Sequence, residues 1–221
     1  MIKAFLFDMD GLLFDTESLG LDLLAVVAVK HGFTLSRERQ LAMLGATTAT
    51  NEMQFREWFG DAVDFPRYSS DWCAMMYDYT AQHGVRKMKG AEDALHTLKQ
   101  RGLKLALCSS SAERMVRHYL SLAGWENMFD AVITGNMVKN GKPAPDIFLK
   151  GAEALGVSPD ECVGVEDSVN GIRALRAAGM TSVMVPDLIP YTDELSPYVD
   201  FCIPSLCELE STIFHDSHMK G

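Results

Sequence analysis

The chain opens with a short apolar run that ends in two carboxylates. Residues 4–7 are all apolar, without a polar residue at alternate positions. A strand of this kind is buried on both faces, which is typical of a parallel sheet covered by helices. Asp8 and Asp10 follow at once. Because binding sites on such sheets lie beyond the carboxyl ends of the strands, this pattern predicts a site at residue 8 and after.

From residue 91 onward, helical and strand patterns alternate with short links. This alternation is the signature of successive βα units, and it predicts an α/β fold with a Rossmann-like parallel sheet that also includes residues 2–7. The expected helices cover residues 91–101, 112–123, 145–155, 168–178 and 205–214. The expected strands cover residues 103–108, 131–134, 162–165, 181–185 and 200–203.

Residues 15–84 follow a different pattern, because helical stretches succeed one another without a strand between them. Gly60 and Pro66 are expected helix breaks. We therefore expect an all-helical cap domain at 15–84, inserted into a catalytic core made of residues 1–14 and 85–221, which would cover the strand ends and select the substrate. Its predicted helices cover residues 15–31, 36–44, 47–59 and 67–83.

Composition narrows the class of protein. With 221 residues, 48% apolar and 23% charged, the chain is an ordinary globular protein. Its net charge of -10 argues against nucleic acid or an anionic membrane as a partner. No apolar stretch has the length of a membrane span, and the first strand begins without a leader, so we expect a monomeric cytoplasmic protein.

The five cysteines point to neither a disulfide framework nor a metal site. They form no Cys-x-x-Cys pair, and two of them fall inside predicted buried strands. We expect reduced thiols of the core. The cysteines stand at positions 73, 108, 162, 202 and 207.

Asp8 and Asp10 carry the first chemical signal. In an extended segment, residues two apart project to the same side, and two like charges held together need a cation or a shared proton. A divalent metal ion is the simplest solution. On this motif alone, a turn whose carboxylates only accept hydrogen bonds from backbone amides explains the pair equally well.

Three further strand ends carry polar residues, and the carboxyl ends of parallel strands meet at one edge of the sheet. These groups are therefore expected to converge on the two aspartates. They are Ser109, Ser110 and Ser111, then Gly141, Lys142 and Pro143, and finally Glu166, Asp167 and Ser168.

Each of these groups also has a purely structural interpretation. Ser110 to Glu113 fits the Ser-x-x-Glu capping box, which favours a helix cap there and leaves Ser109 freer for another task. Asp167 taken alone is more often a helix cap. Lys142 taken alone is a solvated loop lysine, but beside four carboxylates it would neutralise them and grip phosphate.

Two common motifs are absent. Gly141 and Lys142 do not form a phosphate-binding P-loop, since the preceding Gly135 is one position too far away and Pro143 replaces the required Ser or Thr. The first carboxylate segment is not a calcium-binding EF-hand loop either, because position twelve counted from Asp8 is Leu19 and not Glu.

Taken in order, the four segments resemble the haloacid dehalogenase superfamily of phosphohydrolases, and the resemblance spans nearly the whole chain. A helical cap after the first motif is similar to the subgroup that contains β-phosphoglucomutase and the sugar-phosphate or nucleotide phosphatases. The resemblance is carried by residues 8–17, Ser109, residues 141–148, and residues 165–172 followed by 177–180.

The resemblance implies a role for each site residue. Asp8 would attack phosphorus and form an aspartyl-phosphate. Asp10, oriented by Thr16, would protonate the leaving oxygen and then deprotonate the hydrolytic water. Ser109 and Lys142 would bind the phosphate oxygens and offset the charge that develops during transfer. Further phosphate or substrate contacts are expected from Gly11, Ser110, Thr16 and Thr47.

The implied cofactor is Mg²⁺, which favours oxygen ligands. Its ligands would be Asp8, the backbone carbonyl of Asp10 and Asp167, with Glu166 bound directly or through water. Asp146, which follows a proline, is expected to begin a helix and stays outside the catalytic set.

The acceptor of the phosphoryl group separates two activities. A β-phosphoglucomutase holds a second phosphate with a His, an Arg and a Lys, and the matching positions here are Gly20, Thr48 and Ala112. Without those cations, hydrolysis is favoured, and a mutase or a non-catalytic binding protein is the alternative. The expected substrate is a small phosphorylated metabolite, with sugar phosphates before nucleoside monophosphates.

The sequence of the cap gives little information about which substrate is bound. Residues 45–48 suggest a small polar loop that faces the aspartates and suits hydroxyl groups. Large apolar residues of the cap could line a leaving-group pocket, but at helical spacing a place in the cap core is favoured. They are Phe55, Trp58, Trp72, Met75 and Met76.

Overall fold

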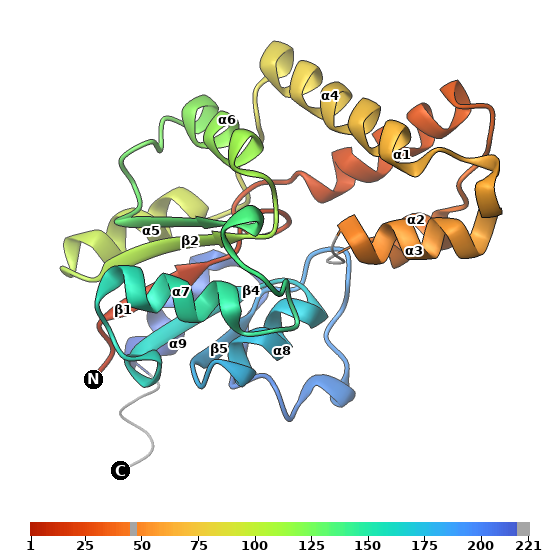
Figure 1. Ribbon diagram of the computed structural model, residues 1–221. Coiled ribbons are helices and arrows are strands. Elements are labelled where there is room, and N and C mark those ends of the chain that lie inside the picture. Colours follow the sequence, from red (N-terminus) through yellow and green to blue (C-terminus); the bar gives the residue numbers. More distant parts are fainter. Residues whose placement is uncertain (45–47, 216–221) are drawn as a thin grey trace.

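One parallel sheet organises the molecule. The structure is a computed structural model that describes residues 1–44 and 48–215. Within these residues the sheet has the strand order β3-β2-β1-β4-β5-β6 (Figure 1), which confirms the predicted α/β class. The strands are β1 (Ala4–Phe7), β2 (Lys104–Ser109), β3 (Ala131–Thr134), β4 (Cys162–Glu166), β5 (Thr181–Met184) and β6 (Phe201–Cys202).

The central position of β1 brings distant parts of the sequence together. Phe7, its last residue, is in register with Leu107 of β2 on one side and Val165 of β4 on the other. The next residues along the three strands therefore share one edge of the sheet, as the alternation of elements predicted.

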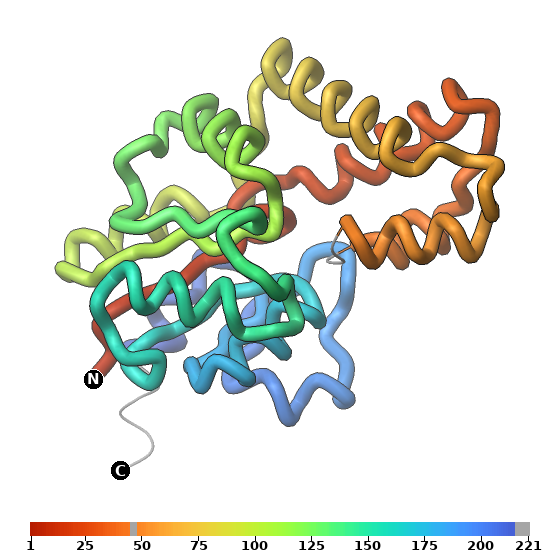
Figure 2. The backbone as a smooth tube through the Cα atoms, viewed as in Figure 1, coloured from red at the N-terminus to blue at the C-terminus, as the bar shows by residue number. Residues whose placement is uncertain are grey.

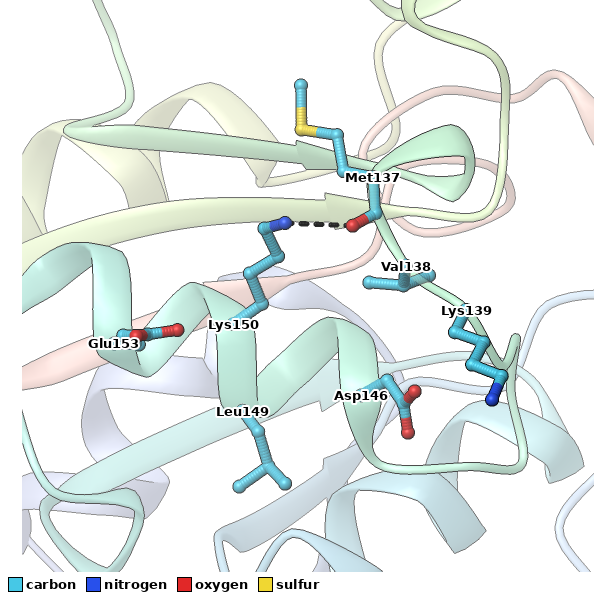
Figure 3. A pocket seen from close by; sticks show the side chains of 7 residues that line it. All are labelled: Met137, Val138, Lys139, Asp146, Leu149, Lys150 and Glu153. Atoms are coloured by element: carbon cyan, nitrogen blue, oxygen red, sulfur yellow. Dashed lines mark hydrogen bonds between the residues drawn. The ribbon is translucent and has the colours of Figure 1, made fainter.

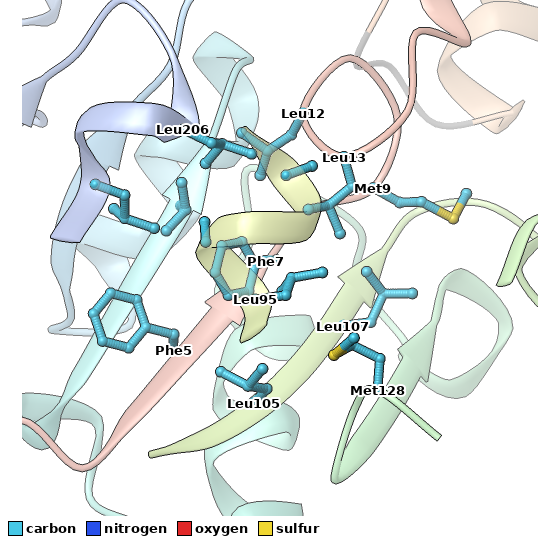
Figure 4. Packing of buried hydrophobic residues seen from close by; sticks show 14 of the residues in the cluster. Phe5, Phe7, Met9, Leu12, Leu13, Leu95, Leu105, Leu107, Met128 and Leu206 are labelled. Atoms are coloured by element: carbon cyan, nitrogen blue, oxygen red, sulfur yellow. The ribbon is translucent and has the colours of Figure 1, made fainter. Parts of the chain in front are cut away.

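Helices cover both faces of the sheet. Phe5 and Phe7 pack on one face against α5, α6 and α9, while Ala4 and Leu6 pack on the other against α7 and α8 (Figures 1 and 4). This alternation explains why β1 is apolar throughout. These helices are α5 (Ala91–Gln100), α6 (Glu113–Ala123), α7 (Asp146–Leu155), α8 (Val169–Ala177) and α9 (Leu209–His215).

A separate group of helices lies beyond the strand ends (Figure 1). It has its own apolar cluster, in which Leu21, Phe55 and Tyr68 are almost completely buried. Of the large apolar residues considered for a substrate pocket, Phe55 and Met76 are buried and Trp58, Trp72 and Met75 are partly buried in apolar clusters, as the core interpretation predicted. The helices are α1 (Glu17–Lys30), α2 (Arg37–Ala42), α3 (Thr48–Phe59) and α4 (Phe65–His83).

The chain crosses between the two groups twice, and the crossings pair with each other (Figure 2). Asp15 donates its N–H to the carbonyl of Arg86 at 2.9 Å, and Met88 donates to Leu13 at 2.9 Å. Phe14 forms an antiparallel bridge with Lys87. A pair of short extended segments thus joins the helices to the sheet.

Some local predictions were wrong. Pro66 does not break a helix, because it lies in the first turn of α4, where its missing N–H is not needed. The cysteines are all free, but only Cys108 and Cys162 are buried; Cys73, Cys202 and Cys207 are exposed.

Among the described residues, no helix is both long and apolar enough to cross a membrane.

The contact between α1 and α4 can be tested at Tyr68. Its buried hydroxyl donates to the carbonyl of Leu24 at 2.9 Å. Tyr68→Phe removes this bond and is expected to lower the free energy of unfolding by about 0.5–1.5 kcal/mol, measured by urea denaturation. The control is Tyr79→Phe on the same helix, whose side chain is 42% exposed. Equal effects of the two substitutions would contradict the assignment.

Candidate active site

The site begins where β1 ends. Asp8 continues the strand, since its N–H donates to the carbonyl of Val165 at 3.1 Å. The chain then turns at Gly11, which has φ of 78°. A side chain at this position would also collide with Asp167, since an ideal Cβ would lie 2.5 Å from Oδ2 of that residue. Glycine therefore allows the turn and the close approach of a second acidic segment.

Lys142 joins the first and fourth strand ends through a buried ion cluster. Its ammonium group donates to Oδ1 of Asp8 and, at 2.5 Å, to Oε1 of Glu166. Lys142 is 5% exposed and Asp8 is 7% exposed, so both charges are withdrawn from water. The lysine of the loop after β3 is thus not a solvated surface residue. It neutralises carboxylates, as the alternative interpretation predicted.

The charges in this cluster are not balanced. Burial raises the pKa of Asp8 to about 7, although Lys142 acts in the opposite direction. The pKa of Asp167 is raised well above its ordinary value by burial and by the nearby charge of Glu166. Burial disfavours the charged form of Lys142, but the two carboxylates outweigh it and raise its pKa. The site therefore has more negative charge than one ammonium group can offset.

Asp10 is held by hydroxyl groups. Thr16 donates to its Oδ1 at 2.6 Å, and Ser111 donates to its Oδ2 at 2.8 Å. Burial raises the pKa of Asp10, while these hydrogen bonds act to lower it. The contact from Thr16 is the one expected from the resemblance, so its hydroxyl serves to fix the orientation of the second carboxylate.

Glu166 is anchored by several donors. Its Oε2 accepts the backbone N–H of Asp167 at 3.0 Å and both the N–H and the hydroxyl of Ser168 at 2.9 Å. Gly171 makes room for it, since a Cβ there would lie 1.8 Å from Cδ of Glu166. The cap of α8 is Ser168, which accepts from the N–H of Gly171. Asp167 is consequently not the helix cap and is available for another role.

The donor set fits a divalent metal ion. One carboxylate oxygen from each of Asp8, Glu166 and Asp167 lies within 4.8 Å of the others, and all three residues are buried. Hard oxygen ligands and excess negative charge suit Mg²⁺. The carboxylate of Asp10 is engaged by Thr16 and Ser111 and is not one of these three groups.

The serine segment differs from its prediction at the start of α6 and at Ser110. The capping-box interpretation is wrong, because the N-cap of α6 is Ala112 and it makes no side-chain cap bond. Ser109 is fully buried and its Oγ accepts the N–H of Ser111 at 3.1 Å. Ser110, expected to bind phosphate, is exposed. Ser111 contacts Asp10 instead.

Two other expectations concerned Thr47 and Asp146. Thr47, expected to contact the substrate, lies outside the described residues, as do Gly45 and Ala46 of the polar loop. Asp146 begins α7, and its Oδ2 accepts the side chain of Asn140 at 3.0 Å, away from the catalytic set.

Sequence reasoning expected Ser111 to lie near the aspartates but gave it no role there, and it did not assign Glu17 to the site. Glu17 is the first residue of α1. Burial and the charges of Asp10 and Asp8 raise its pKa to about 8. An acidic residue in the first turn of a helix is common, because it interacts favourably with the helix dipole. The sequence therefore gave no reason to place Glu17 in the site. The folded chain shows that Glu17 lies beside the turn after Asp10, since an ideal Cβ at Gly11 would lie 3.1 Å from Cδ of Glu17.

A surface pocket of about 310 Å³ lies elsewhere, between α7 and the loop that precedes Lys142 (Figure 3). Lys150 closes one side of it by donating to the carbonyl of Met137 at 2.8 Å. The residues that line it are not the carboxylates of the strand ends. The pocket is therefore distinct from the candidate active site.

Comparisons with known proteins agree with this geometry. Residues 2–179 match the family model described as haloacid dehalogenase-like hydrolase. Bacillus subtilis YhcW, named as a candidate phosphatase, is 32% identical over 98% of this chain and 97% of its own length. Escherichia coli hexitol phosphatase B is 30% identical over 94% of each chain.

A solved structure extends the likeness to the fold. The crystal structure of CbbY from Rhodobacter sphaeroides in complex with phosphate has a TM-score of 0.84 and is 26% identical. The match covers 95% of this chain and 96% of CbbY. The sheet and the helical insertion are thus both part of the shared fold.

The raised pKa of Asp8 has a measurable consequence for stability. The pKa of Asp8 is about 7 in the folded state and ordinarily 3.8, so folding favours its protonated form. The stability that this preference contributes is fully present below pH 4 and is lost progressively as the pH rises to about 7. In EDTA, Asp8→Asn is therefore expected to stabilise the protein relative to wild type increasingly from pH 4 to 7. The gain should reach about 2–4 kcal/mol above pH 7.

The measurement is urea unfolding across this pH range. The control is Asp22→Asn, which removes an exposed carboxylate of α1 and should give a small difference. A stability difference between Asp8→Asn and wild type that stays constant with pH would contradict the electrostatic account.

Proposed function

The chain belongs to the haloacid dehalogenase-like hydrolase family and is a phosphoric monoester hydrolase, and from this premise we propose that it hydrolyses a small phosphorylated metabolite through an aspartyl-phosphate. The observation that carries the proposal is the buried contact of Lys142 with Asp8 and Glu166 at the sheet edge. This contact supports the proposal because the reaction would need a carboxylate nucleophile beside a cation for the phosphate, and Asp8 lies against Lys142 and near a second carboxylate, Asp10.

The proposed reaction has two displacements. A carboxylate oxygen of Asp8 attacks phosphorus, the bond from phosphorus to the leaving oxygen breaks, and Asp10 gives that oxygen its proton. Asp10 then takes a proton from water, whose oxygen attacks the same phosphorus. The bond between Asp8 and phosphorus breaks, and inorganic phosphate leaves.

The surrounding residues stabilise the transferred group. Lys142 would contact a phosphate oxygen, because its ammonium group already touches Asp8. Ser109, at the end of β2, would contact another, and it is near enough to Asp10 for its hydroxyl to act on the pKa of that carboxylate. Bound Mg²⁺ would offset the charge of the phosphate. Its ligands would be Asp8, Asp167 and the backbone carbonyl of Asp10, with Glu166 close by.

We assign residues 15–84 to a cap that encloses the leaving group. The paired crossings near Asp15 and Arg86 would allow the cap to move as a unit relative to the sheet. The name hexitol phosphatase B of one relative supports a phosphorylated polyol or sugar as the substrate.

Local packing favours hydrolysis over mutase activity. Gly20, the position at which a mutase carries histidine, lies against Trp72: an ideal Cβ would be 3.3 Å from Cζ2 of the indole. The indole N–H of Trp72 also donates to the carbonyl of Gly20 at 3.0 Å. An imidazole would require the indole to move. The acidic and basic residues that the reaction needs, Asp8, Asp10, Lys142 and Asp167, are all present. Their presence argues against a non-catalytic binding protein.

The proposal is tested by phosphate release from p-nitrophenyl phosphate, sugar phosphates and nucleoside monophosphates, with and without Mg²⁺. Wild type should release phosphate only with Mg²⁺, and Asp8→Asn should lower the rate by at least about 10³-fold, since it removes the nucleophile. Far-ultraviolet circular dichroism checks that the variant is folded. Substantial release by a folded Asp8→Asn protein would exclude the aspartyl-phosphate.

The role of Asp10 is tested by leaving groups of different basicity. Asp10→Asn should lower kcat/KM by about 10²–10⁴-fold for a sugar phosphate, whose alkoxide needs a proton. The loss should be much smaller for p-nitrophenyl phosphate, because its phenolate leaves without one. Equal losses on both substrates would show that Asp10 positions other groups and does not act as the acid.

A further inference from the structure

The carboxylate of Asp10 is held from two separate parts of the chain. Thr16, which donates to its Oδ1 at 2.6 Å, is the N-cap residue of α1 and belongs to the helical insertion. Ser111, which donates to its Oδ2 at 2.8 Å, lies between β2 and α6 and belongs to the sheet part of the molecule. The contact from Thr16 was expected, whereas Ser111 has no role in the proposed reaction. The second contact therefore calls for an explanation.

Helix capping does not account for the hydroxyl of Ser111. The N-cap residue of α6 is Ala112, which makes no side-chain cap bond. The hydroxyl is bonded instead to a carboxylate 101 positions away in the sequence. This contact exists only in the folded chain, so it is not a consequence of local helix geometry.

The backbone of Ser111 is fixed by the sheet. Its N–H donates to Oγ of Ser109 at 3.1 Å, and its carbonyl accepts the N–H of Gly135 at 3.2 Å. These two partners follow from neighbouring strands, since Ser109 of β2 is in register with Thr134 of β3. Gly135 also permits the close approach, because an ideal Cβ there would lie 2.2 Å from the carbonyl oxygen of Ser110. Two paired strands thus place the hydroxyl beside Asp10.

Two donors restrict the carboxylate of Asp10 more than one donor does. Rotation about the Cβ–Cγ bond of an aspartate is only loosely restrained, so a single hydrogen bond leaves the carboxylate free to turn. With one hydroxyl on each oxygen, Thr16 and Ser111 together fix its plane. Each carboxylate oxygen has a second lone-pair site. A contact with the leaving oxygen can therefore form while both hydroxyl groups stay in place.

We propose that Ser111 is a positioning residue, which holds the carboxylate of Asp10 toward the leaving oxygen from the side of the sheet while Thr16 holds it from the side of the insertion. The inference rests on the proposed phosphatase activity, and it assigns Ser111 no contact with the substrate. When the insertion moves relative to the sheet, Thr16 moves with it, and Ser111 keeps Asp10 directed at the phosphate.

The test uses the leaving group, and it measures kcat/KM because this constant reflects the steps up to the departure of that group. Ser111→Ala should lower kcat/KM for glucitol 6-phosphate by about 10- to 100-fold, the effect of one hydrogen bond to a charged group. The value for p-nitrophenyl phosphate should fall by less than about threefold, since its phenolate leaves without a proton. Ser111→Thr, which keeps the hydroxyl, should stay within about threefold of wild type on both substrates.

A double-mutant cycle shows whether Ser111 acts through Asp10. In the Asp10→Asn background, Ser111→Ala should change kcat/KM for glucitol 6-phosphate by less than about threefold, because the orientation of an absent acid does not matter. The matched control is Ser121→Ala, which removes an exposed hydroxyl from α6 and should leave the wild-type values unchanged. A loss as large in the Asp10→Asn background as in wild type, or equal losses on both substrates, would overturn the assignment.

Unfolding measurements separate this inference from the proposed activity. Ser111→Ala should lower the midpoint of urea unfolding in wild type and have a much smaller effect in an Asp10→Ala background, where the partner is missing. This coupling, found even if wild type turned over no substrate, would support the hold of Ser111 on Asp10 and refute the phosphatase. Turnover by wild type without the coupling would refute the role of Ser111 and leave the phosphatase intact.

Discussion

The buried ammonium group of Lys142 is the interaction on which the site depends. Three segments that are far apart in the sequence end at this group: the strand before Asp8, the strand that ends in Glu166 and the loop after β3. Charges removed from water are tolerated only when they are paired and hydrogen-bonded. Lys142 pairs two of them, and the backbone N–H groups at the start of α8 satisfy Glu166 further.

The pairing is incomplete, and this fits a site that must accept further positive charge. Asp8 and Asp167 both have raised pKa values because burial withdraws them from water while other carboxylates stand close by. A folded protein retains such repulsion when binding relieves it. The sheet positions the first of them, since β1 is paired with β2 and β4 and the N–H of Asp8 extends this pairing to Val165.

Much of this arrangement could be predicted from local patterns. The apolar run before Asp8 and the alternation of elements after residue 91 determine the sheet, and the strand ends determine which polar residues converge. Pro66 was misjudged because a proline suits the first turn of a helix as well as a break. The motif from Ser110 to Glu113 predicted a helix cap and gave Ser111 no role of its own, because its partner Asp10 lies 101 positions away and becomes its neighbour only in the folded chain.

Thr16 and Glu17 show why the cap and the chemistry are not independent. Thr16 is the N-cap residue of α1, yet its hydroxyl is bonded to Asp10 and makes no cap bond. Glu17 follows directly and presents a buried acceptor beside the same carboxylate. A rotation of α1 would shift both groups together. The first turn of α1 thus links the position of the helical insertion to the orientation of the second aspartate, because one piece of backbone carries both.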